Sequence, residues 1–394
     1  MLTALIMGFA CGLPLLLTLG LLQAWMKEEG IDLSVIGLTT LVGIPYTLKF
    51  IWAPLFDRYT LPFLGRRRGA MLITQLALMA AILLLAASGP DENFYLMVLA
   101  AFLVAFFSAS QDIVVDAYRR EDLADQELGL GSSLYVNGYR CGMLLASGGG
   151  LILADHMSFP RVYMIMAACM LPAVLTTLMT PEPPLPENSP KTMKEAVIDP
   201  LKEYFSRKGA LWILIFVLMY KIGDAMASAI TTPFYLDVGF TKTHIGTVVK
   251  LFGTSATLIG LLLGGLVLLS FNIYRCLWIF GILQSLSTAS FAILAQIGPN
   301  IAMLSGVIAF ENLSSGMGTA AYAAFMASIT NKRFTATQYA LLSSLMGIPR
   351  VVASAPTGFM AKFLGWETFF IFCALIAIPG LLLINKIVPK DTTQ

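Results

Sequence analysis

Charged residues are scarce in this chain. Asp, Glu, Lys and Arg make up 12% of its 394 residues, whereas hydrophobic residues make up 57%. Soluble proteins carry about 25% charged residues, because water must solvate their surfaces. The composition therefore excludes a soluble globular protein and predicts a polytopic membrane protein.

Cysteines are few and isolated. All five stand singly in or beside apolar stretches, and no two have the CxxC spacing of a metal or redox site. They are Cys11, Cys141, Cys169, Cys276 and Cys373. We interpret them as small buried hydrophobic residues, so neither a metal nor another cofactor is expected.

Motifs for catalysis and for nucleic-acid binding are missing. The only two histidines, His156 and His244, lie at the ends of apolar segments, without an HExxH or nucleophile motif around them. An integral-membrane enzyme such as an acyltransferase or peptidase is therefore disfavoured. The net charge of +2, without a dense basic patch, also argues against a nucleic-acid partner.

Long apolar segments dominate the rest of the chain. A span needs about 20 mainly apolar residues to cross the hydrocarbon core of a bilayer. Twelve segments qualify, near residues 3–25, 36–56, 69–88, 94–118, 129–154, 160–180, 209–236, 244–269, 275–296, 300–329, 335–360 and 366–388. Met1 leads into the first one without a basic region, so we expect that segment to stay in the membrane. Most of the 25 basic residues fall in alternate loops and the C-terminal tail, which predicts cytoplasmic termini.

One long break divides the expected spans six and six. Residues 181–208 begin with PEPPLPENSP, a Pro-rich spacer, and continue with apolar residues at helical spacing. The second part is either an amphipathic helix on the inner leaflet or a solvated linker. We therefore expect an N-terminal six-helix bundle over 1–180, a cytoplasmic linker over 181–208 and a C-terminal six-helix bundle over 209–394.

An internal repeat supports this division. Gly30–Gly37, between the first two expected spans, matches Gly239–Gly246, between the seventh and the eighth. Arg140 and Arg350 are separated by nearly the same interval, and each follows Ser-Ser-Leu by a few residues. Two six-helix halves related about the membrane normal are typical of the major facilitator architecture. The predicted fold is an all-α membrane protein of twelve transmembrane helices.

Several charged residues stand inside the expected spans. Each costs about 2.5–3.5 kcal/mol at the bilayer centre, so such residues usually face a water-filled cavity or a charged partner. They are Lys49, Asp112, Asp116, Arg140, Lys221, Asp224, Lys250, Glu311 and Arg350.

Two of these acids have the surroundings of a proton carrier. Asp112 follows Gln111, and Glu311 precedes Asn312, each among small residues that leave room for water. A carboxylate shielded from bulk water can bind and release a proton near neutral pH. The alternative is a static ion pair with one of the two arginines of the spans.

The other two acids lie near cations on their own helices. Asp224 comes three residues after Lys221, so both face the same side of the seventh helix, either as a local ion pair or in the cavity. We include Asp224 among the candidates for proton coupling. Asp116 lies one turn before Arg119, which favours a gating or structural ion pair.

The cations of the spans imply an anionic substrate, because Arg and Lys bind carboxylates. Tyr and Trp side chains can stack on sugars, although aromatic residues in spans more often serve packing. The expected substrate-binding residues are Lys221, Arg140, Arg350, Gln111, Asn312, Lys49, Tyr46, Gln23, Trp25 and Tyr139.

Four stretches carry a resemblance to a known family. They are QAWM at 23–26, KFIWAPLFDRYTLPFLGRRRG at 49–69, SASQDIVVDAYR at 108–119 and FENLSSGMGTAAYAAFMASITNKRFTATQYALLS at 310–343. Together they resemble the AmpG-type muropeptide permeases of the major facilitator superfamily. The resemblance implies proton-driven import of GlcNAc-anhydroMurNAc-peptides across the inner membrane of a Gram-negative bacterium. A transporter of another bulky anion such as acetyl-CoA, or a membrane receptor, is the alternative.

The loop between the second and third spans implies a gate. The superfamily pattern pairs an acid with nearby basic residues there, and this chain has Asp57 followed by Arg66, Arg67 and Arg68. Five additional residues, TLPFL, separate the acid from Gly65, as in the AmpG-type proteins. We expect Asp57 and one of the arginines to form a cytoplasmic charge latch. Nothing in the sequence predicts an oligomer, so the expected partners are an anionic glycopeptide, protons and the lipid bilayer.

Overall fold

The computed structural model is helical through most of the residues that it describes. These are residues 1–31, 35–36, 39–60, 64–90, 93–184, 190, 192–207, 209–241, 244–349, 353 and 356–388. Within them, helical segments lie in each of the twelve ranges that the sequence predicts as spans. The repeated segments Gly30–Gly37 and Gly239–Gly246 fall partly outside the described residues.

The first half of the chain has both continuous and broken helices. The elements of the first three spans are α1 (Leu2–Leu16), η1 (Leu17–Leu21), α2 (Leu22–Glu28), η2 (Thr39–Gly43), α4 (Ile44–Leu48), η3 (Lys49–Ile51), α5 (Ala53–Arg58) and α6 (Arg66–Ala87). Those of the next three are α7 (Phe94–Asp122), α8 (Leu128–Leu144), η4 (Leu145–Gly149), α9 (Gly150–Ala154), α10 (Phe159–Ala168) and α11 (Leu171–Met179).

A helix precedes the second half of the chain, where the sequence allowed either an amphipathic helix or a solvated linker. That helix is α12 (Met193–Ser206), in which Ala196 and Tyr204 are buried while Met193, Val197 and Leu201 are exposed. The later elements are α13 (Ala210–Met219), α14 (Ile222–Ala229), α15 (Thr231–Val238), η5 (Ile245–Phe252), α17 (Gly253–Ser270), α18 (Ile273–Ile297), α19 (Ile301–Ser328), η6 (Lys332–Phe334), α20 (Thr335–Ile348), α21 (Thr357–Leu364) and α22 (Trp366–Ile387).

Not every expected span is a long apolar helix. Among the described residues, 8 helices are long and apolar enough to cross a membrane. The second span is instead divided into short pieces, and Pro45 and Pro54 stand in the first turns of two of them. Proline cannot donate a backbone hydrogen bond, so it is tolerated where a helix begins and interrupts one elsewhere. The tenth span, α19, is continuous but rich in small and polar residues.

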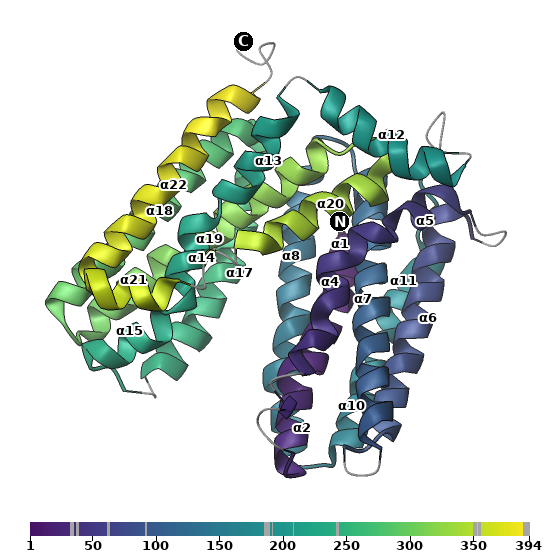
Figure 1. Cartoon of the computed structure of the whole chain (residues 1–394), viewed down its shortest axis with the longest axis horizontal. Coiled ribbons are helices and arrows are strands. Elements are labelled where there is room, and N and C mark those ends of the chain that lie inside the picture. The colour runs from purple at the N-terminus through teal and green to yellow at the C-terminus, as the bar shows by residue number, and fades with distance from the viewer. Residues whose placement is uncertain are drawn as a thin grey trace. The chain divides into compact units, whose positions relative to one another are not determined.

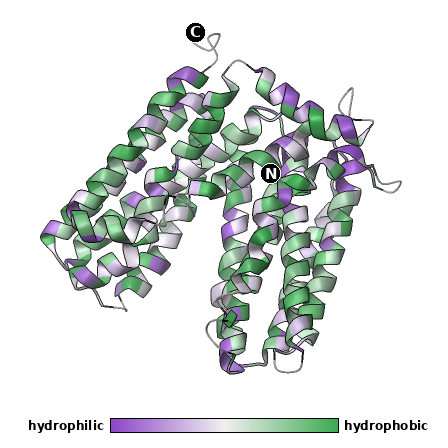
Figure 2. Ribbon diagram, viewed as in Figure 1, coloured by the Kyte–Doolittle hydropathy of each residue, from purple (hydrophilic) through white to green (hydrophobic). Residues whose placement is uncertain are grey.

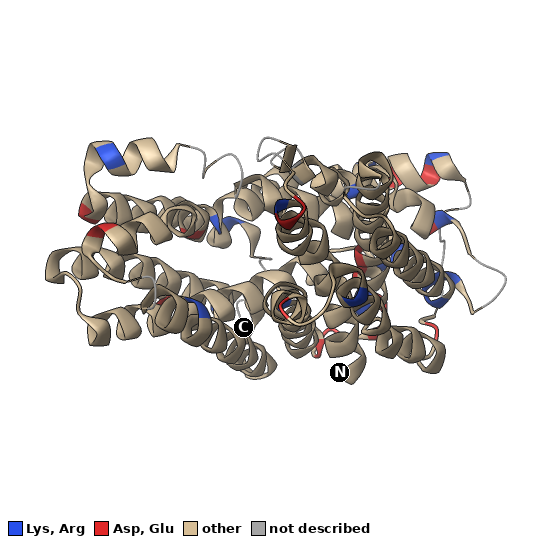
Figure 3. Cartoon of the chain, turned by 90° about the horizontal axis from the view of Figure 1, so that it is seen from below, with Lys and Arg blue, Asp and Glu red and all other residues tan. Residues whose placement is uncertain are grey.

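Hydropathy follows the helices. Hydrophobic residues run along most of each helix, and hydrophilic residues are more frequent near helix ends and in α12 (Figure 2). Long stretches of helix carry no charge at all (Figure 3). The few charged residues inside helices therefore stand out, as the sequence predicts.

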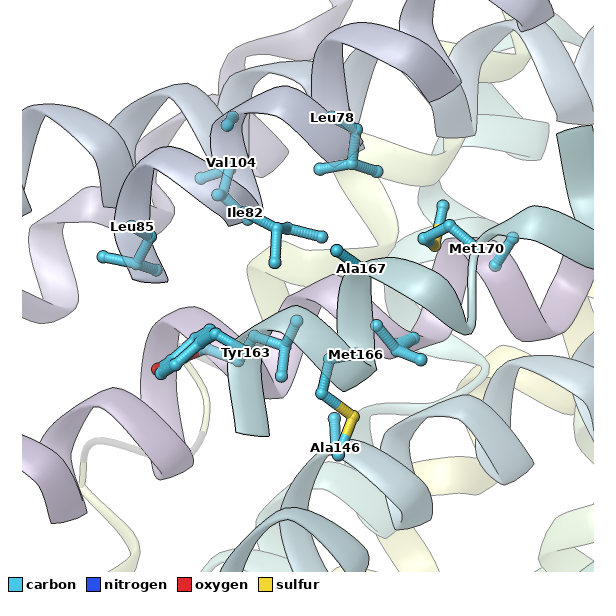
Figure 4. Close-up of a cluster of buried hydrophobic side chains, with 14 of the residues drawn as sticks. Leu78, Ile82, Leu85, Val104, Ala146, Tyr163, Met166, Ala167 and Met170 are labelled. Carbon is cyan, nitrogen blue, oxygen red and sulfur yellow. The ribbon is translucent and has the colours of Figure 1, made fainter. Parts of the chain in front are cut away.

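The chain forms two compact units. Unit 1 contains Met1–Asp125, Leu134–Leu201 and Thr330–Ser344. In its core, α6 packs against α7 and α10. Figure 4 shows apolar side chains from these helices, from η4 and from the residue before α11 pointing toward one another: Leu78, Ile82, Leu85, Val104, Ala146, Tyr163, Met166, Ala167 and Met170.

Glycines allow α1 and α8 to approach closely within unit 1. A Cβ atom at Gly8 or Gly12 would collide with the backbone of α8, and one at Gly138 or Gly142 would collide with the backbone of α1. Each helix thus presents two glycines four residues apart to the other, the pattern that permits close helix packing in membranes.

Unit 2 contains Gln126–Ser133, Lys202–Ile329 and Leu345–Gln394. In this unit α18 and α22 lie side by side along much of their length (Figure 1). The helices α17 and α19 also pack closely. A Cβ atom at Gly260 or Gly316 would collide with the backbone of the other helix, so glycine at these positions permits the contact. An aromatic cluster that includes Phe234, Phe291 and Phe370 fills one end of the unit.

Candidate functional site

Unit 1 holds a buried ion pair between the second and fourth spans. Lys49 Nζ lies 3.9 Å from Asp112 Oδ2, and each side chain is only 9% exposed. The short 3₁₀ segment η3 carries Lys49 between α4 and α5, so the break in the second span delivers the cation to this position. The sequence left open an ion pair between Asp112 and an arginine, but the cation that pairs with Asp112 is Lys49. Arg350 lies outside the described residues.

Polar side chains surround Asp112. Gln111 Nε2 donates to Cys11 Sγ over 3.5 Å. Gln111 Oε1 and Asp112 Oδ1 are buried and accept no hydrogen bond from the described part of the chain. Buried polar atoms normally have partners, so these two oxygens are available to a proton, a water molecule or a ligand. Tyr139 is half-buried nearby on α8, with its ring 6.3 Å from that of Tyr135.

Unit 2 holds a second group of charges where the seventh span is interrupted. The helix stops at Met219 and resumes at Ile222. Lys221, in this break, lies 3.5 Å from Asp224 Oδ2 and donates to Gln284 Oε1 over 3.3 Å. Asp224 also lines a small cavity together with Tyr220 and Gln284. The ion pair that the sequence predicts on this helix is therefore present, and the helix is broken beside it.

Glu311 belongs to the same group of charges. Its Oε2 accepts a hydrogen bond of 2.6 Å from Ser287, and it interacts electrostatically with Asp224 and Lys221. The arrangement therefore brings two acids and the cation Lys221 into one group. Sequence reasoning missed Gln284 and Ser287, because a lone Gln or Ser in an apolar helix does not stand out.

Of the remaining candidate binding residues, two take part in contacts between helices and three are partly buried. Asn312 Oδ1 accepts a hydrogen bond of 2.8 Å from Thr257, which joins α19 to α17. Trp25 is buried, stacks on Phe159 with ring centroids 5.6 Å apart, and donates to Glu29. These contacts make Asn312 and Trp25 parts of helix packing in this structure. Other members of the expected set, Gln23, Tyr46 and Arg140, are partly buried.

A charge cluster lies at the end of the second span in unit 1. Arg67 Nη2 donates to Asp57 Oδ1 over 2.8 Å and to Glu121 Oε1 over 2.6 Å. Arg66 donates to both oxygens of Glu121. All four side chains are buried. Of the three arginines that the sequence offers to Asp57, Arg67 is therefore the one that pairs with it, and Glu121 is a second acid that the sequence analysis did not include.

Asp57 also holds the beginning of α20. Its carboxylate accepts hydrogen bonds from the backbone N–H groups of Ala336 and Thr337, over 3.1 and 2.8 Å, and from the Thr337 hydroxyl. The first N–H groups of a helix have no partners within the helix, and the helix dipole favours a negative charge there. Asp57 therefore anchors a segment from the second half of the sequence within unit 1.

The third arginine has a different role. Arg68 donates to the carbonyl oxygens of Thr177 and Leu178, at the end of α11. The backbone N–H groups of Arg67 and Arg68 donate to the Glu182 carboxylate, which caps α6. The sequence analysis predicted a loop at Arg66–Arg68, but these residues form the first turn of α6. The helix can begin there because the carboxylate of Glu182 accepts hydrogen bonds from its free N–H groups.

Arg119 forms a second connection to α20 inside unit 1. It donates to Asp116 Oδ1 over 3.1 Å and to the Tyr339 hydroxyl over 2.7 Å. Its guanidinium also lies over the ring of Tyr135, 4.3 Å from the centroid. The sequence expected Arg119 in a loop after residue 118. It lies instead inside α7, which continues to Asp122, because ion pairing and aromatic contacts satisfy the buried charge.

Helical segments in each of the twelve expected spans, with charges held among them, are typical of a polytopic membrane protein. A family model described as Major Facilitator Superfamily matches residues 2–354. The chain is 44% identical to the anhydromuropeptide permease of Escherichia coli strain K12 over 96% of this chain and 78% of that protein. It is 33% identical to putative transporter AmpG 4 of Rickettsia conorii, over 96% and 94% of the two chains.

A solved structure shows the same fold. The fucose:proton symporter FucP of E. coli superposes with a TM-score of 0.76, at 14% sequence identity, over 99% of this chain and 98% of that one. This chain belongs to the Major Facilitator Superfamily, among its AmpG-type permeases. The fold class and the family that the sequence predicts are both confirmed.

Proposed function

We propose that this protein is a proton-driven importer of anhydromuropeptides, which carries GlcNAc-anhydroMurNAc-peptides from the periplasm to the cytoplasm. The observation that carries the proposal is the 44% identity to the E. coli anhydromuropeptide permease along nearly the whole chain. The charges buried in the spans support it, because an anionic glycopeptide and a proton both need charged groups inside the membrane.

Two groups of acids inside the spans are the proposed proton-coupling sites. One is Asp112 with Lys49, and the other is Glu311 with Asp224 and Lys221. In each, a cation is close enough to stabilise the acid when it has lost its proton. Moving one proton inward at 100 mV releases about 2.3 kcal/mol, which is sufficient to concentrate a neutral solute.

The proposed substrate site uses the cations and amides of the spans. Lys221 and Lys49 bind carboxylates of the peptide when the acids beside them are protonated, so proton binding and substrate binding favour each other. The other proposed contacts are Arg140, Arg350, Gln111, Asn312, Tyr46, Tyr139, Gln23 and Trp25.

The proposed gate is the cluster around Asp57. Its hydrogen bonds hold the beginning of α20 within unit 1, and in this proposal they break when that side of the protein opens. The cluster is positioned by Arg66, Arg67 and Arg68. A second connection to α20 comes from Arg119, which is paired with Asp116. We place this side in the cytoplasm, with both chain termini, in the inner membrane of a Gram-negative bacterium, and we expect the protein to act as a monomer.

Uptake by proteoliposomes tests the proposal. The purified protein is reconstituted, and radiolabelled anhydromuropeptide is added outside, with or without an imposed inward proton gradient. We expect accumulation that requires the gradient and that a protonophore abolishes, while protein-free vesicles take up nothing. Binding without accumulation would refute active transport, and the absence of both would refute the substrate.

A further inference from the structure

The surface of unit 2 carries cations and tryptophans at one end. The helices α13 and α18 begin there, and α22, which packs against both, ends there. Trp212 and Trp278 lie near the beginnings of α13 and α18, and Lys386 lies in the last turn of α22. We call the surface formed by Lys386, Trp212, Trp278 and Arg275 the basic rim.

Lys386 lies over one of these tryptophans. Its Nζ is 4.2 Å from the centroid of the Trp212 ring. A cation is attracted to the face of an indole, but the contact leaves its positive charge in place. Lys386 is exposed, and it takes part in none of the ion pairs of the described residues. Trp212 therefore orients an ammonium group at the surface without neutralising it.

Arg275 supplies a second cation beside the first. It precedes Trp278 by three residues, so both lie on the same side of α18. Trp278 in turn donates from Nε1 to Asn385 Oδ1 over 3.2 Å, and Asn385 adjoins Lys386 in α22. Arg275 is exposed, and it forms no ion pair with any part of the chain that the structure describes. The contact between α18 and α22 thus brings two cations to one rim.

The three helices supply no acid at this end. Every residue of α13, α18 and α22 is described by the structure, and the only acid among them is Glu367. It stands in the first turn of α22, at the opposite end from Lys386. The basic rim therefore has an excess of positive charge, which an anionic partner would complement.

The neighbouring surface of the same helices is apolar. Ile378 and Leu382 of α22 are exposed, and so is Ile282 of α18. In a membrane protein such residues meet lipid chains, tryptophans gather at the boundary of the hydrocarbon, and long cationic side chains reach the headgroups. The order from apolar residues through indoles to cations therefore matches the layers of one leaflet of a bilayer.

We propose that the basic rim binds the headgroup of an anionic phospholipid, with Lys386 and Arg275 on its phosphate. Both side chains donate charge-assisted hydrogen bonds to phosphate oxygens, and the acyl chains lie on the apolar surface beside the rim. A zwitterionic lipid binds less tightly, because its own cationic group is repelled by the two side chains. Each cation near a membrane surface corresponds to about a fivefold preference for an anionic lipid. This contact does not depend on the solute that the protein transports.

Mass spectrometry of intact protein–lipid complexes tests the contact. The delipidated full chain is titrated in detergent with phosphatidylglycerol, or with phosphatidylcholine that has the same acyl chains. The variants are Lys386→Gln, Arg275→Gln, Lys386→Arg and the control Lys362→Gln, which neutralises an exposed lysine of α21 in the same unit. We expect the wild-type protein and Lys362→Gln to bind phosphatidylglycerol more tightly than phosphatidylcholine. Lys386→Gln and Arg275→Gln should each lose about fivefold of this preference, and Lys386→Arg should keep it.

Other outcomes contradict the proposal. Equal affinity of the wild-type protein for the two lipids, or an unchanged preference in both neutralised variants of the rim, would show that the rim does not select an anionic headgroup. A similar loss in Lys362→Gln would indicate a diffuse attraction to all surface cations. Weaker binding of both lipids to the rim variants, without a change in preference, would mean that Lys386 and Arg275 serve folding. Displacement of the lipid by inorganic phosphate would identify a site for the free anion instead of a lipid site.

Discussion

The two proposed proton carriers, Asp112 and Glu311, differ in the groups that their carboxylates contact. Asp112 has a single charged partner, Lys49, at 3.9 Å. Glu311 has no direct ion pair among the described residues and instead accepts a hydrogen bond from Ser287. An amide at either position keeps the size and most of the hydrogen bonds of the acid but cannot exchange a proton. Amide substitutions therefore separate coupling from binding.

We predict that Asp112→Asn and Glu311→Gln each abolish accumulation driven by the proton gradient while leaving counterflow, the exchange of labelled for unlabelled substrate. Counterflow needs alternating access but no net proton movement, so it should survive. Both rates are measured in the same proteoliposomes. Glu367→Gln, which neutralises an exposed acid of α22, serves as the control and should change neither rate. Loss of both activities in an amide variant would mean that the acid serves binding or folding.

The sequence predicts which charges lie inside the spans, but it does not predict the groups that they contact on other helices. Isolated acids in apolar segments identify Asp112 and Glu311, because the cost of a charge in a membrane implies a function. Their partners come from other helices, so spacing along the chain cannot reveal them. Lys49 reaches Asp112 only because the second span is broken at η3. Spacing indicates a partner only where both residues stand on one helix, as Asp224 does for Lys221 and Asp116 for Arg119.

At the scale of the helix, small residues decide which spans can pack together. The contact between α1 and α8 depends on four glycines, two on each side. The GxxxG spacing is visible in the sequence, but it does not say which two helices meet. In the same way, twelve spans are predictable from apolar length, whereas the break in the seventh span at Lys221 and the π-helical segment η1 are not. Such interruptions depend on tertiary contacts that satisfy the freed backbone groups.

A substitution at Gly138 tests the packing of α1 against α8. A Cβ atom there would collide with the carbonyl oxygen of Leu5, and backbone atoms cannot move aside as a flexible side chain can. We predict that Gly138→Ala destabilises the protein by about 1–3 kcal/mol, the usual cost of overpacking. The matched control is Gly148→Ala in the same span, where a Cβ atom would meet nothing within 4 Å.

Thermal unfolding in detergent measures this difference. Gly138→Ala should unfold at a lower temperature than the wild-type protein, while Gly148→Ala should not. Equal unfolding temperatures for the two variants would show that α1 and α8 are not in close contact in the folded protein.

At the scale of the whole molecule, a few hydrogen bonds connect segments that are far apart in the sequence. Asp57 accepts the N–H groups of Ala336 and Thr337, about 280 residues later in the chain. The family resemblance predicts a latch of Asp57 with an arginine, and Arg67 fills that role. The capping of α20 was not predictable, because it involves backbone groups, which leave no mark in the sequence. Ala336 and Ala340 then pack with Ala53 and Ala117 in a small apolar cluster.

Asp57→Asn should therefore favour opening of the side that we propose to be cytoplasmic. The amide has the same shape, but it loses the charge that interacts with the helix dipole and with Arg67. Such interactions contribute about 0.3–2 kcal/mol, so we predict that the population open to the cytoplasm rises by up to about thirtyfold. The reporter is Ala340→Cys, placed in a Cys141→Ser background that removes the exposed native cysteine. Inverted membrane vesicles expose the cytoplasmic side to an impermeant maleimide, and the rate of labelling at residue 340 is measured.

The control for this measurement is Asp125→Asn, which removes another acid paired with an arginine, Arg120, without touching α20. Labelling at residue 340 should be faster with Asp57→Asn than with Asp125→Asn, because only the former removes an anchor of α20. An excess of transported substrate should change both rates, since binding shifts the same equilibrium. If Asp57→Asn labels no faster than Asp125→Asn, the hydrogen bonds to Ala336 and Thr337 do not control opening, and Arg119 with Tyr339 becomes the remaining connection that can hold α20 in place.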